Sequence, residues 1–172
     1  APRRLGLPSF GRRGPIERKP LMASKTTKSG TLAEALARVL ADTQALAIQT
    51  QNFHWNVTGP QFYELHKFFE ALYGELSGAI DELAERMRAL NAYAPGSLGA
   101  YARLTTIKDV ERPLAAKDML RHALDGHVAA AASAKAALES AQEAGDEPTA
   151  DLMIERLSAL EKAIWMLRTT PA

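Results

Sequence analysis

The chain has 172 residues, of which 47% are hydrophobic, and a formal net charge of +1, which suits one ordinary domain with a packed core. It has no cysteine, so disulfides and thiolate metal sites are excluded. No apolar run approaches the ~18 residues of a membrane span, and the N-terminus lacks the apolar block of a secretory signal. We therefore expect an intracellular, soluble protein.

The charges are divided unevenly along the chain. Residues 1–29 carry eight basic residues and one acid, a net +7, whereas the remainder carries −6. Because residues 1–29 are rich in Pro, Gly and Ser without periodicity, we predict a disordered arm there and one domain over residues 30–172. A basic arm on an acidic body is typical of nucleic-acid binders, and a solubilising tail is the alternative. Met22 leaves open a natural start at that residue. The basic residues of the arm are Arg3, Arg4, Arg12, Arg13, Arg18, Lys19, Lys25 and Lys28.

Two long amphipathic helices are predicted in the first half of the chain. The first begins at a capping box, Thr31 to Glu34, and its apolar residues recur every three or four positions to about Val57. Gly59-Pro60 ends this helix and starts the second, which spans about 61–90. A two-residue break of this kind indicates an antiparallel hairpin of the two helices.

The second half of the chain predicts two more long helices after a long connection. Residues 92–98 break the second helix, and a short helix is expected over about 98–104. The third helix spans about 114–144 and is alanine-rich, and the fourth spans about 149–169. Four long helices, a long crossover between the second and third, and no strand pattern predict an all-α, ferritin-like four-helix bundle with a short extra helix in the crossover.

Two histidines flank the predicted hairpin symmetrically. His54 lies six residues before Pro60, and His66 lies six residues after it. In an antiparallel hairpin the two side chains fall at about the same level. Two imidazoles that face one point indicate a site for a first-row transition metal.

The second helix carries a polar stripe apart from its apolar face. With His66 at 0° on a wheel of 100° per residue, Glu70 lies at roughly 40°, Asp81 at roughly 60° and Glu85 at roughly 100°, whereas the apolar stripe centres at roughly −80°. From His66 to Asp81 is about 22 Å at a rise of 1.5 Å per residue. Since metal–ligand bonds are about 2.0–2.3 Å long, no single ion can touch both ends.

Two interpretations of this stripe remain open. The polar residues can be an ordinary solvated surface. Alternatively, a second copy of the helix runs antiparallel alongside, about a two-fold axis near residues 74–75, and an isologous dimer then completes two identical sites. The residues near that axis are small, so two helices can approach closely. They are Gly74, Ser77 and Gly78.

These residues resemble the Dps family, the twelve-subunit mini-ferritins. The run HWNVTGPQFYELHKFFE at 54–70 resembles the first signature of the family, and DELAERMRAL at 81–90 resembles the second. EKAIWML at 161–167 is similar to the last helix of the family. The resemblance covers about residues 31–169, and two signatures at this spacing are highly specific.

The resemblance implies iron binding between two-fold-related subunits. One subunit would supply His54, His66 and Glu70, and the other would supply Asp81 and Glu85. Many family members have Asp at the position of Glu70, so its contact with iron is either direct or through water.

The resemblance also implies the reaction. The expected activity is that of a ferroxidase, which oxidises Fe(II) to Fe(III), preferably with hydrogen peroxide consumed by two irons, and stores ferric oxide inside a homododecamer. This chemistry would protect DNA from oxidative damage. Trp55 matches a tryptophan beside the site in the family, and a packing residue is the alternative.

An acidic group at the junction of the third and fourth helices matches the three-fold pore through which iron enters in this family. A ring of carboxylates would concentrate Fe(II), whereas acids at a helix start, favoured by the helix dipole, are the alternative. We expect Asp146 and Asp151 to be the pore residues among the four. The group comprises Glu143, Asp146, Glu147 and Asp151. His122 and His127 lie about 140° apart on the third helix, so we expect both to be structural or exposed.

Two alternative functions remain open. The chain can act mainly as a nucleoid-associated, DNA-compacting protein through its basic arm, with non-specific and salt-dependent binding to phosphates. It can also be a purely structural bundle with a polar dimer seam. The expected localisation is the cytoplasm, at the nucleoid.

Overall fold

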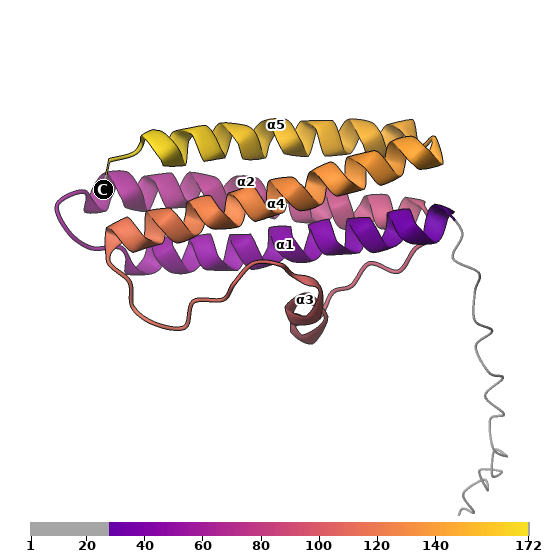
Figure 1. Cartoon of the computed structure of the whole chain (residues 1–172). Coiled ribbons are helices and arrows are strands. Elements are labelled where there is room, and N and C mark those ends of the chain that lie inside the picture. The colour runs from indigo at the N-terminus through magenta and orange to yellow at the C-terminus, as the bar shows by residue number, and fades with distance from the viewer. Residues whose placement is uncertain (1–27, 172) are drawn as a thin grey trace, which may run out of the picture.

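The structure is a computed structural model, and it describes residues 28–171. Five helices lie in this part of the chain, and residues 28–171 contain no strand. Figure 1 shows four long helices side by side and the short α3 outside them. The helices are α1 (Lys28–Asn56), α2 (Phe62–Ala89), α3 (Leu98–Leu104), α4 (Ala116–Ala144) and α5 (Glu147–Thr169). The predicted all-α bundle with a short crossover helix is confirmed.

The first helix begins at Lys28, not at the capping box predicted at Thr31. Lys28, Ser29 and Gly30 add most of one turn before this sequence. Helix α1 therefore includes Lys28 and Ser29, which the sequence analysis placed in the arm, and the division into an arm and a domain stays a prediction. The other arm residues, 1–27, lie outside the part of the chain that the structure describes.

The start of α5 was also predicted two residues too late. Asp146 caps α5, since its carboxylate accepts hydrogen bonds from the backbone N–H and the hydroxyl of Thr149, and Pro148 fits the first turn. Gly145 ends α4 with a φ of +69°, a left-handed conformation that favours glycine. The guanidinium of Arg86, on α2, donates to both carboxylate oxygens of Asp146 at 2.6 and 2.8 Å. This ion pair fastens the end of α2 to the start of α5.

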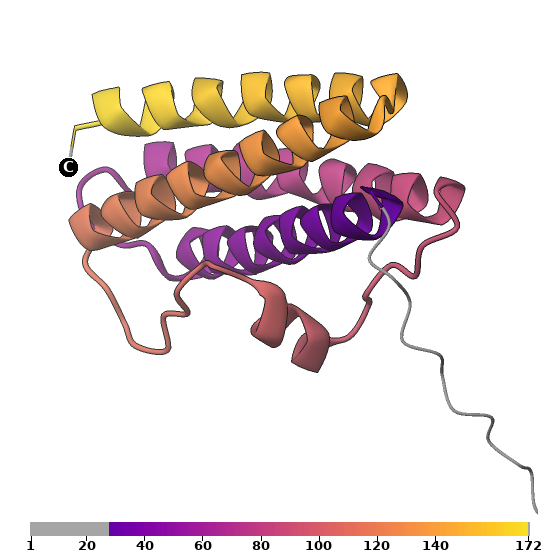
Figure 2. The ribbon, with the colours of Figure 1, turned by 45° about the vertical axis from the view of Figure 1, so that its right-hand side comes forward.

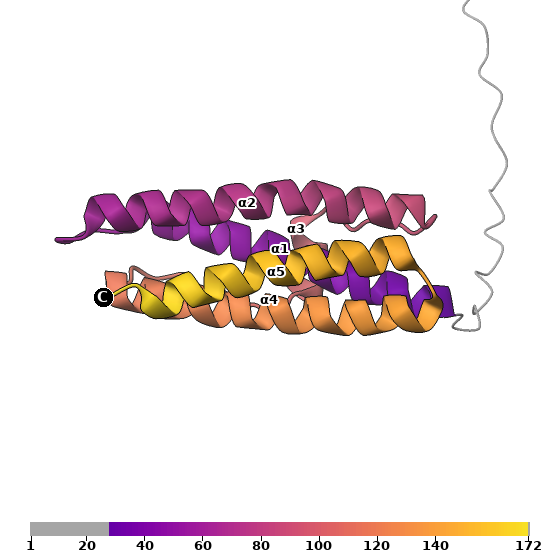
Figure 3. The ribbon, with the colours of Figure 1, turned by 90° about the horizontal axis from the view of Figure 1, so that it is seen from above.

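The bundle consists of two antiparallel hairpins joined by the long crossover. α1 packs against α2 and α4, and α4 packs against α5. Figures 1 and 2 show that the crossover travels the length of the bundle outside α1, with α3 midway, so that α2 and α4 run in the same direction. Seen from above, α2 lies on one side of the bundle and the α4–α5 hairpin on the other (Figure 3). This connectivity is that of ferritin-like bundles.

The core divides into two apolar clusters along the bundle axis. One lies at the hairpin end, where Phe53 of α1 meets Phe69 of α2 with ring centroids 5.7 Å apart. The other extends toward the opposite end, and α4 contributes mainly alanines to it. These small side chains let α4 pack closely against its neighbours. The buried alanines are Ala130, Ala134, Ala137 and Ala141. No helix within residues 28–171 is long and apolar enough to cross a membrane.

A fully buried carboxylate anchors the crossover. Asp42 of α1 has no exposed surface, and it accepts hydrogen bonds from the hydroxyl and backbone N–H of Thr106 and from the hydroxyls of Thr105 and Ser133. Thr105 and Thr106 follow α3, whereas Ser133 lies on α4. One side chain therefore holds α1, the crossover and α4 together, and no basic residue pairs with it in the described chain.

Candidate metal centre

The two hairpin histidines lie against each other. The rings of His54, near the end of α1, and His66, on α2, stack with centroids 3.8 Å apart and an interplanar angle of 24°. Gly59 makes this turn possible, since its φ of +111° is strained for any residue with a side chain. The proximity predicted from the symmetric spacing about Pro60 is confirmed, whereas metal binding itself stays a prediction.

Reciprocal hydrogen bonds determine which ring nitrogens remain available. His54 Nδ1 lies 2.9 Å from the backbone oxygen of His66, and His66 Nδ1 lies 2.9 Å from the backbone oxygen of His54. A carbonyl oxygen can only accept, so each Nδ1 carries the proton and donates. In the neutral ring, Nε2 then carries the lone pair. Both imidazoles are therefore locked as the tautomer that can bind a metal through Nε2.

Neighbouring rings restrict how the two imidazoles move. The ring of Tyr73 meets that of His54 edge-on, with centroids 5.3 Å apart, and the ring centroid of Phe62 lies 5.2 Å from that of His66. His54 is 8% exposed, and His66 is partly exposed. The pair is thus oriented by aromatic contacts yet open on one side.

Glu70 lies one turn after His66 on α2, at the i,i+4 spacing that places two side chains on one face. Its Oε2 accepts from Lys67 Nζ at 2.6 Å. The hydrogen bond and the charge of Lys67 lower the pKa of Glu70, with smaller contributions from His54 and His66. Glu70 is therefore a carboxylate beside the imidazoles, already paired with a cation.

The other two candidate ligands lie farther along the same helix. Asp81 and Glu85 are exposed, and neither forms an ion pair or hydrogen bond within residues 28–171. In this part of one chain, no three His, Asp or Glu side chains lie close enough together to hold one ion. One chain therefore presents two separate polar groups: the stacked histidines with Glu70, and the pair Asp81 and Glu85.

The middle of α2 is open between these two groups. A Cβ built on Gly74 or Gly78 would meet no atom within 4 Å. Ser77 bonds only its own helix, through a hydroxyl that donates to the backbone oxygen of Tyr73 at 2.8 Å. The exposed side of α2 is therefore flat between the two polar groups.

Exposed aromatic side chains continue this open surface at the hairpin. Trp55 is 67% exposed and Tyr63 is 67% exposed, although both are large apolar residues. Trp55 belongs to neither apolar cluster of the described chain, so packing in the core of one copy does not account for it. Large exposed aromatics beside a flat helix face are typical of an interface with another protein.

The interior of the bundle contains a buried cation, Arg156, and a buried histidine, His127. Arg156 of α5 is buried, and its guanidinium bonds both carboxylate oxygens of Glu75 on α2. His127 of α4 is 1% exposed, donates from Nδ1 to the backbone oxygen of Ala123 at 2.7 Å, and has its pKa lowered mainly by burial. A buried guanidinium repels metal ions, so the bundle interior does not offer an alternative metal centre. His127 is therefore buried and bonded to its own helix, in agreement with the expectation that it is structural or exposed.

The four acids at the α4–α5 junction differ in their surroundings. Asp146 is mostly buried in its bonds to Arg86 and Thr149. Burial acts to raise the pKa of Asp146, but the hydrogen bonds from Arg86 and Thr149 outweigh it and the pKa is lowered. Asp151 is exposed and forms no ion pair in the described chain. Glu143 and Glu147 are exposed.

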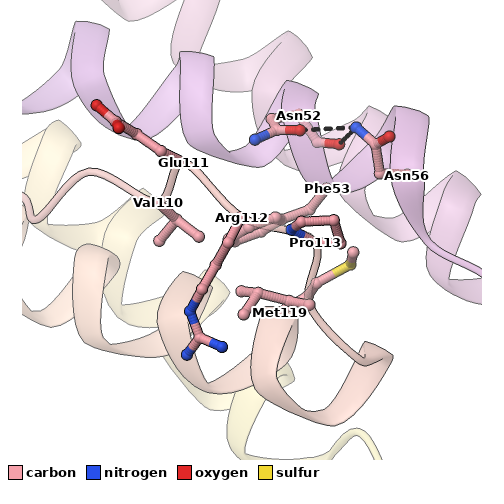
Figure 4. Close-up of a pocket in the computed structure, with 9 residues that line it drawn as sticks. Asn52, Phe53, Asn56, Val110, Glu111, Arg112, Pro113 and Met119 are labelled. Atoms are coloured by element: carbon pink, nitrogen blue, oxygen red, sulfur yellow. Dashed lines mark hydrogen bonds between the residues drawn. The ribbon is translucent and has the colours of Figure 1, made fainter.

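A separate cavity lies where the crossover meets the end of α1. It encloses about 270 Å³ and is lined by side chains that include Asn52, Phe53, Glu111 and Arg112. Figure 4 shows Asn56 at its rim, where its amide nitrogen donates to the side-chain oxygen of Asn52 at 2.7 Å. The cavity offers one carboxylate and no histidine, so it does not compete with the hairpin histidines as a metal centre.

Several residues of the site were not anticipated from the sequence. Lys67 and Tyr73 are two such residues: Lys67 pairs with Glu70, and Tyr73 contacts His54. A basic residue directly after a candidate ligand, with an acid three positions later, is a visible ion-pair pattern. Tyr73 gave no such signal, since an aromatic residue on an amphipathic helix is ordinarily part of its apolar face.

Comparison with known proteins identifies relatives along most of the chain. Residues 33–170 match the model of the ferritin-like domain. The chain is 38% identical over 143 residues to a DNA protection during starvation protein from Brevibacillus brevis, covering 83% of this chain and 96% of the relative. It is 36% identical over 135 residues to DNA protection during starvation protein 2 from Bacillus anthracis, covering 78% and 92%.

Solved structures agree with these matches. The crystal structure of a Dps protein from Bacillus brevis superimposes with a TM-score of 0.80 at 37% identity, over 84% of this chain and 97% of that chain. A Dps protein from Vibrio cholerae, described as a member of a broad superfamily of ferritin-like diiron-carboxylate proteins, superimposes with a TM-score of 0.79 at 35% identity, over 90% and 98%. This chain therefore belongs to the ferritin-like proteins and, within them, to the Dps family.

Proposed function

We propose that this chain is an iron-storage and detoxification mini-ferritin that oxidises Fe(II) at centres shared between two copies. The observation that carries the proposal is the stacked pair His54 and His66, whose Nδ1–H groups are both bonded to carbonyls, so that both Nε2 atoms remain for a metal. Membership of the Dps family and the diiron-carboxylate description of a relative support iron as the substrate.

The second half of each centre would come from a two-fold-related copy. Asp81 and Glu85 are exposed carboxylates without a cation in the described chain, and Asp81 lies about 22 Å along α2 from His66. An antiparallel copy of α2, centred near Gly74, would bring them opposite His66 and Glu70. Imidazole and carboxylate together bind Fe(II) and tolerate the added charge of Fe(III).

In the reaction we propose, two Fe(II) ions reduce one molecule of hydrogen peroxide. Each iron gives up one electron, the O–O bond breaks, and the two oxygens leave as water with two protons from solvent. Two electrons passed together avoid release of hydroxyl radical. The Fe(III) product then moves into the cavity of a dodecameric shell and is stored as ferric oxide.

Iron would reach the cavity through acidic pores at the α4–α5 junction. Of the two candidates, Asp151 is exposed and unpaired in the described chain, whereas Asp146 is held by Arg86. We therefore propose Asp151 as the carboxylate that faces arriving Fe(II), and Asp146 as the residue that fixes the pore wall. Trp55, which is exposed next to His54, is proposed to lie beside the centre.

Peroxide-driven oxidation of Fe(II), followed by absorbance of the ferric product, tests the proposal. Wild-type protein is expected to oxidise Fe(II) faster with peroxide than with dioxygen and to consume two irons per peroxide. Replacement of both His54 and His66 by alanine is expected to slow oxidation at least about tenfold. Removing a residue that only hydrogen-bonds to a metal ligand already costs about that much, and here the ligands themselves are removed. His122→Ala is the matched control. Oxidation at the wild-type rate by the double variant would exclude the assigned centre.

A second function, non-specific DNA binding, is favoured by the net charge of +7 over residues 1–29 and by relatives named for DNA protection. We propose that the basic arm binds phosphates, at the nucleoid in the cytoplasm. Gel shifts at rising salt, with and without residues 1–27, are the measurement. We expect retardation that falls steeply as salt rises and that is lost when the arm is removed. Equal retardation by both forms would exclude the arm as the DNA-binding element.

A further inference from the structure

Lys67 occupies an unusual place among the candidate ligands. It follows His66 directly on α2, and its Nζ lies 2.6 Å from Oε2 of Glu70. The hydrogen bond and the charge of Glu70 raise the pKa of Lys67, and the reverse interaction lowers the pKa of Glu70. Both groups are therefore charged at neutral pH, and the ion pair is present before any metal arrives.

The ion pair contributes little to folding. The side chain of Lys67 is 53% exposed and that of Glu70 is 43% exposed, and exposed pairs one helical turn apart are weak. What is particular to this pair is its position. Glu70 lies one helical turn after His66 on the same face of α2, yet within the described chain it does not join the two imidazoles closely enough to hold one ion while it is paired with Lys67. An ammonium group and a metal ion would then compete for the same carboxylate.

We propose that Lys67 is a displaceable counter-ion that sets the metal affinity of this centre through Glu70. Before metal binds, the ammonium neutralises the carboxylate. An incoming divalent cation, held by the two imidazoles, takes the carboxylate over and repels the ammonium into solvent. When iron leaves as product, Lys67 pairs with Glu70 again, so the carboxylate is never without a cation. This inference rests on the proposed function, because it concerns the same centre.

The consequence is an affinity that is lower than the ligands alone would give. Lys67 weakens binding in two ways: it repels a second cation, and it must release Glu70 first. A unit charge a few ångströms from a divalent ion, in largely aqueous surroundings, changes affinity by about tenfold. Such weakening favours passage of iron through the centre over its retention there.

Titration of the full-length assembled protein with Co(II), followed by its visible absorption spectrum, measures this affinity without any oxidation. Lys67→Gln is expected to lower the Kd for Co(II) about tenfold, whereas Lys67→Arg keeps the charge and is expected to leave it near the wild-type value. Lys135→Gln is the matched control, since Lys135 is an exposed lysine of α4 without an ion pair in the described chain. An unchanged Kd in Lys67→Gln overturns the inference.

A double-variant cycle tests whether Lys67 acts through Glu70. In a Glu70→Gln background, Lys67→Gln is expected to lower the Kd by only about fivefold, because repulsion of the metal by Lys67 is still removed but no carboxylate is left to release. A tenfold gain that persists in this background would overturn the inference, since it would show a general charge effect. Absence of Co(II) binding by the wild type, or binding unaffected when both His54 and His66 are alanine, would instead overturn the proposed function.

Discussion

In a single chain, His54 and His66 already have the orientation that the proposed metal site requires. Each ring gives its Nδ1 proton to the backbone of the other, so two short side-chain contacts fix both tautomers and the distance between the helices. A ligand held in its binding orientation loses less entropy when the metal arrives. At the scale of single residues, the hairpin would therefore supply one half of the proposed site, and another copy would bring the carboxylates of Asp81 and Glu85.

His127 shows how burial at one residue makes stability depend on pH. Burial lowers the pKa of the folded state below the ordinary 6.5, helped by Arg156 and opposed by the Ala123 carbonyl and Glu75. The unfolded chain therefore binds a proton that the folded chain does not. The contribution of neutral His127 is complete above pH 6.5 and is lost as pH falls below it, by up to about 1.4 kcal/mol per pH unit.

Thermal unfolding between pH 8 and pH 5 tests this prediction. Wild-type protein is expected to lose stability below pH 6.5 more steeply than His127→Gln, in which the titrating group is absent. His122→Gln is the control, since His122 is only partly buried. Equal pH dependence of the wild type and His127→Gln would contradict the assignment.

The residue scale also shows where sequence reasoning ends. The spacing of His54 and His66 about Pro60 was sufficient to predict their contact, because helix geometry fixes the level of each residue in a hairpin. The partners of Arg156 and Asp42 were not predictable in the same way. Each pairs with a group more than sixty residues away, and helical periodicity contains no information about which buried polar groups will face each other.

At the scale of elements, the exposed face of α2 determines whether a second copy can approach. Gly74 and Gly78 leave this face flat, with no neighbouring atom within 4 Å of an added Cβ. Gly74→Arg is therefore expected to leave the fold of one chain intact, and replacement of a helical glycine raises helix propensity by up to about 1 kcal/mol. The same change would place a large cation at the proposed two-fold axis.

Light scattering coupled to size-exclusion chromatography, together with circular dichroism, distinguishes these effects. Gly74→Arg is expected to lose the assembly while its helix content is retained. Ala132→Arg, on the exposed side of α4, is the matched control and is expected to assemble. An assembly of wild-type size in Gly74→Arg would argue against an interface along α2.

The crossover is the other element whose placement depends on one residue. Replacement of Asp42 by alanine would leave the hydroxyls of Thr105 and Ser133 and the backbone N–H of Thr106 without their acceptor. We expect a loss of about 2–4 kcal/mol in the free energy of unfolding. Glu139→Ala, an exposed position of α4, is expected to change it by less than about 0.5 kcal/mol.

Urea denaturation of the two variants measures the difference. A loss in Asp42→Ala no larger than that in Glu139→Ala would show that the buried carboxylate does not hold the crossover.

Element positions were predictable to within a few residues, and the errors have a physical cause. The short helix 98–104 was predicted with its observed bounds, whereas α1 and α5 both begin earlier than predicted. The N-terminus of α5 depends on the cap supplied by Asp146, and that cap is oriented by Arg86 from a different helix. The periodicity of apolar residues predicts that a helix is present, but contacts with distant residues help to determine where it begins.

At the scale of the whole molecule, the separation of the candidate ligands along one helix would make the proposed iron oxidation depend on assembly. The histidines with Glu70 lie near one end of α2 and Asp81 with Glu85 near the other, and within residues 28–171 of one chain neither group brings three such side chains close enough to hold one ion. Two copies related by a two-fold axis would complete both at once. A protein built in this way would oxidise iron only when assembled, where the product can be enclosed.

Complementation between two inactive variants is the most direct measurement of this central claim. His66→Ala chains keep the acidic half-site, and Asp81→Ala chains keep the histidine half-site. After unfolding, mixing in equal amounts and co-assembly, half of the dimers pair the two variants and each such dimer contains one intact site. Fe(II) oxidation by peroxide is therefore expected to recover to about a quarter of the wild-type rate per chain, although each variant alone is inactive. Co-assembled particles that remain as inactive as the separate variants would contradict centres shared between two copies.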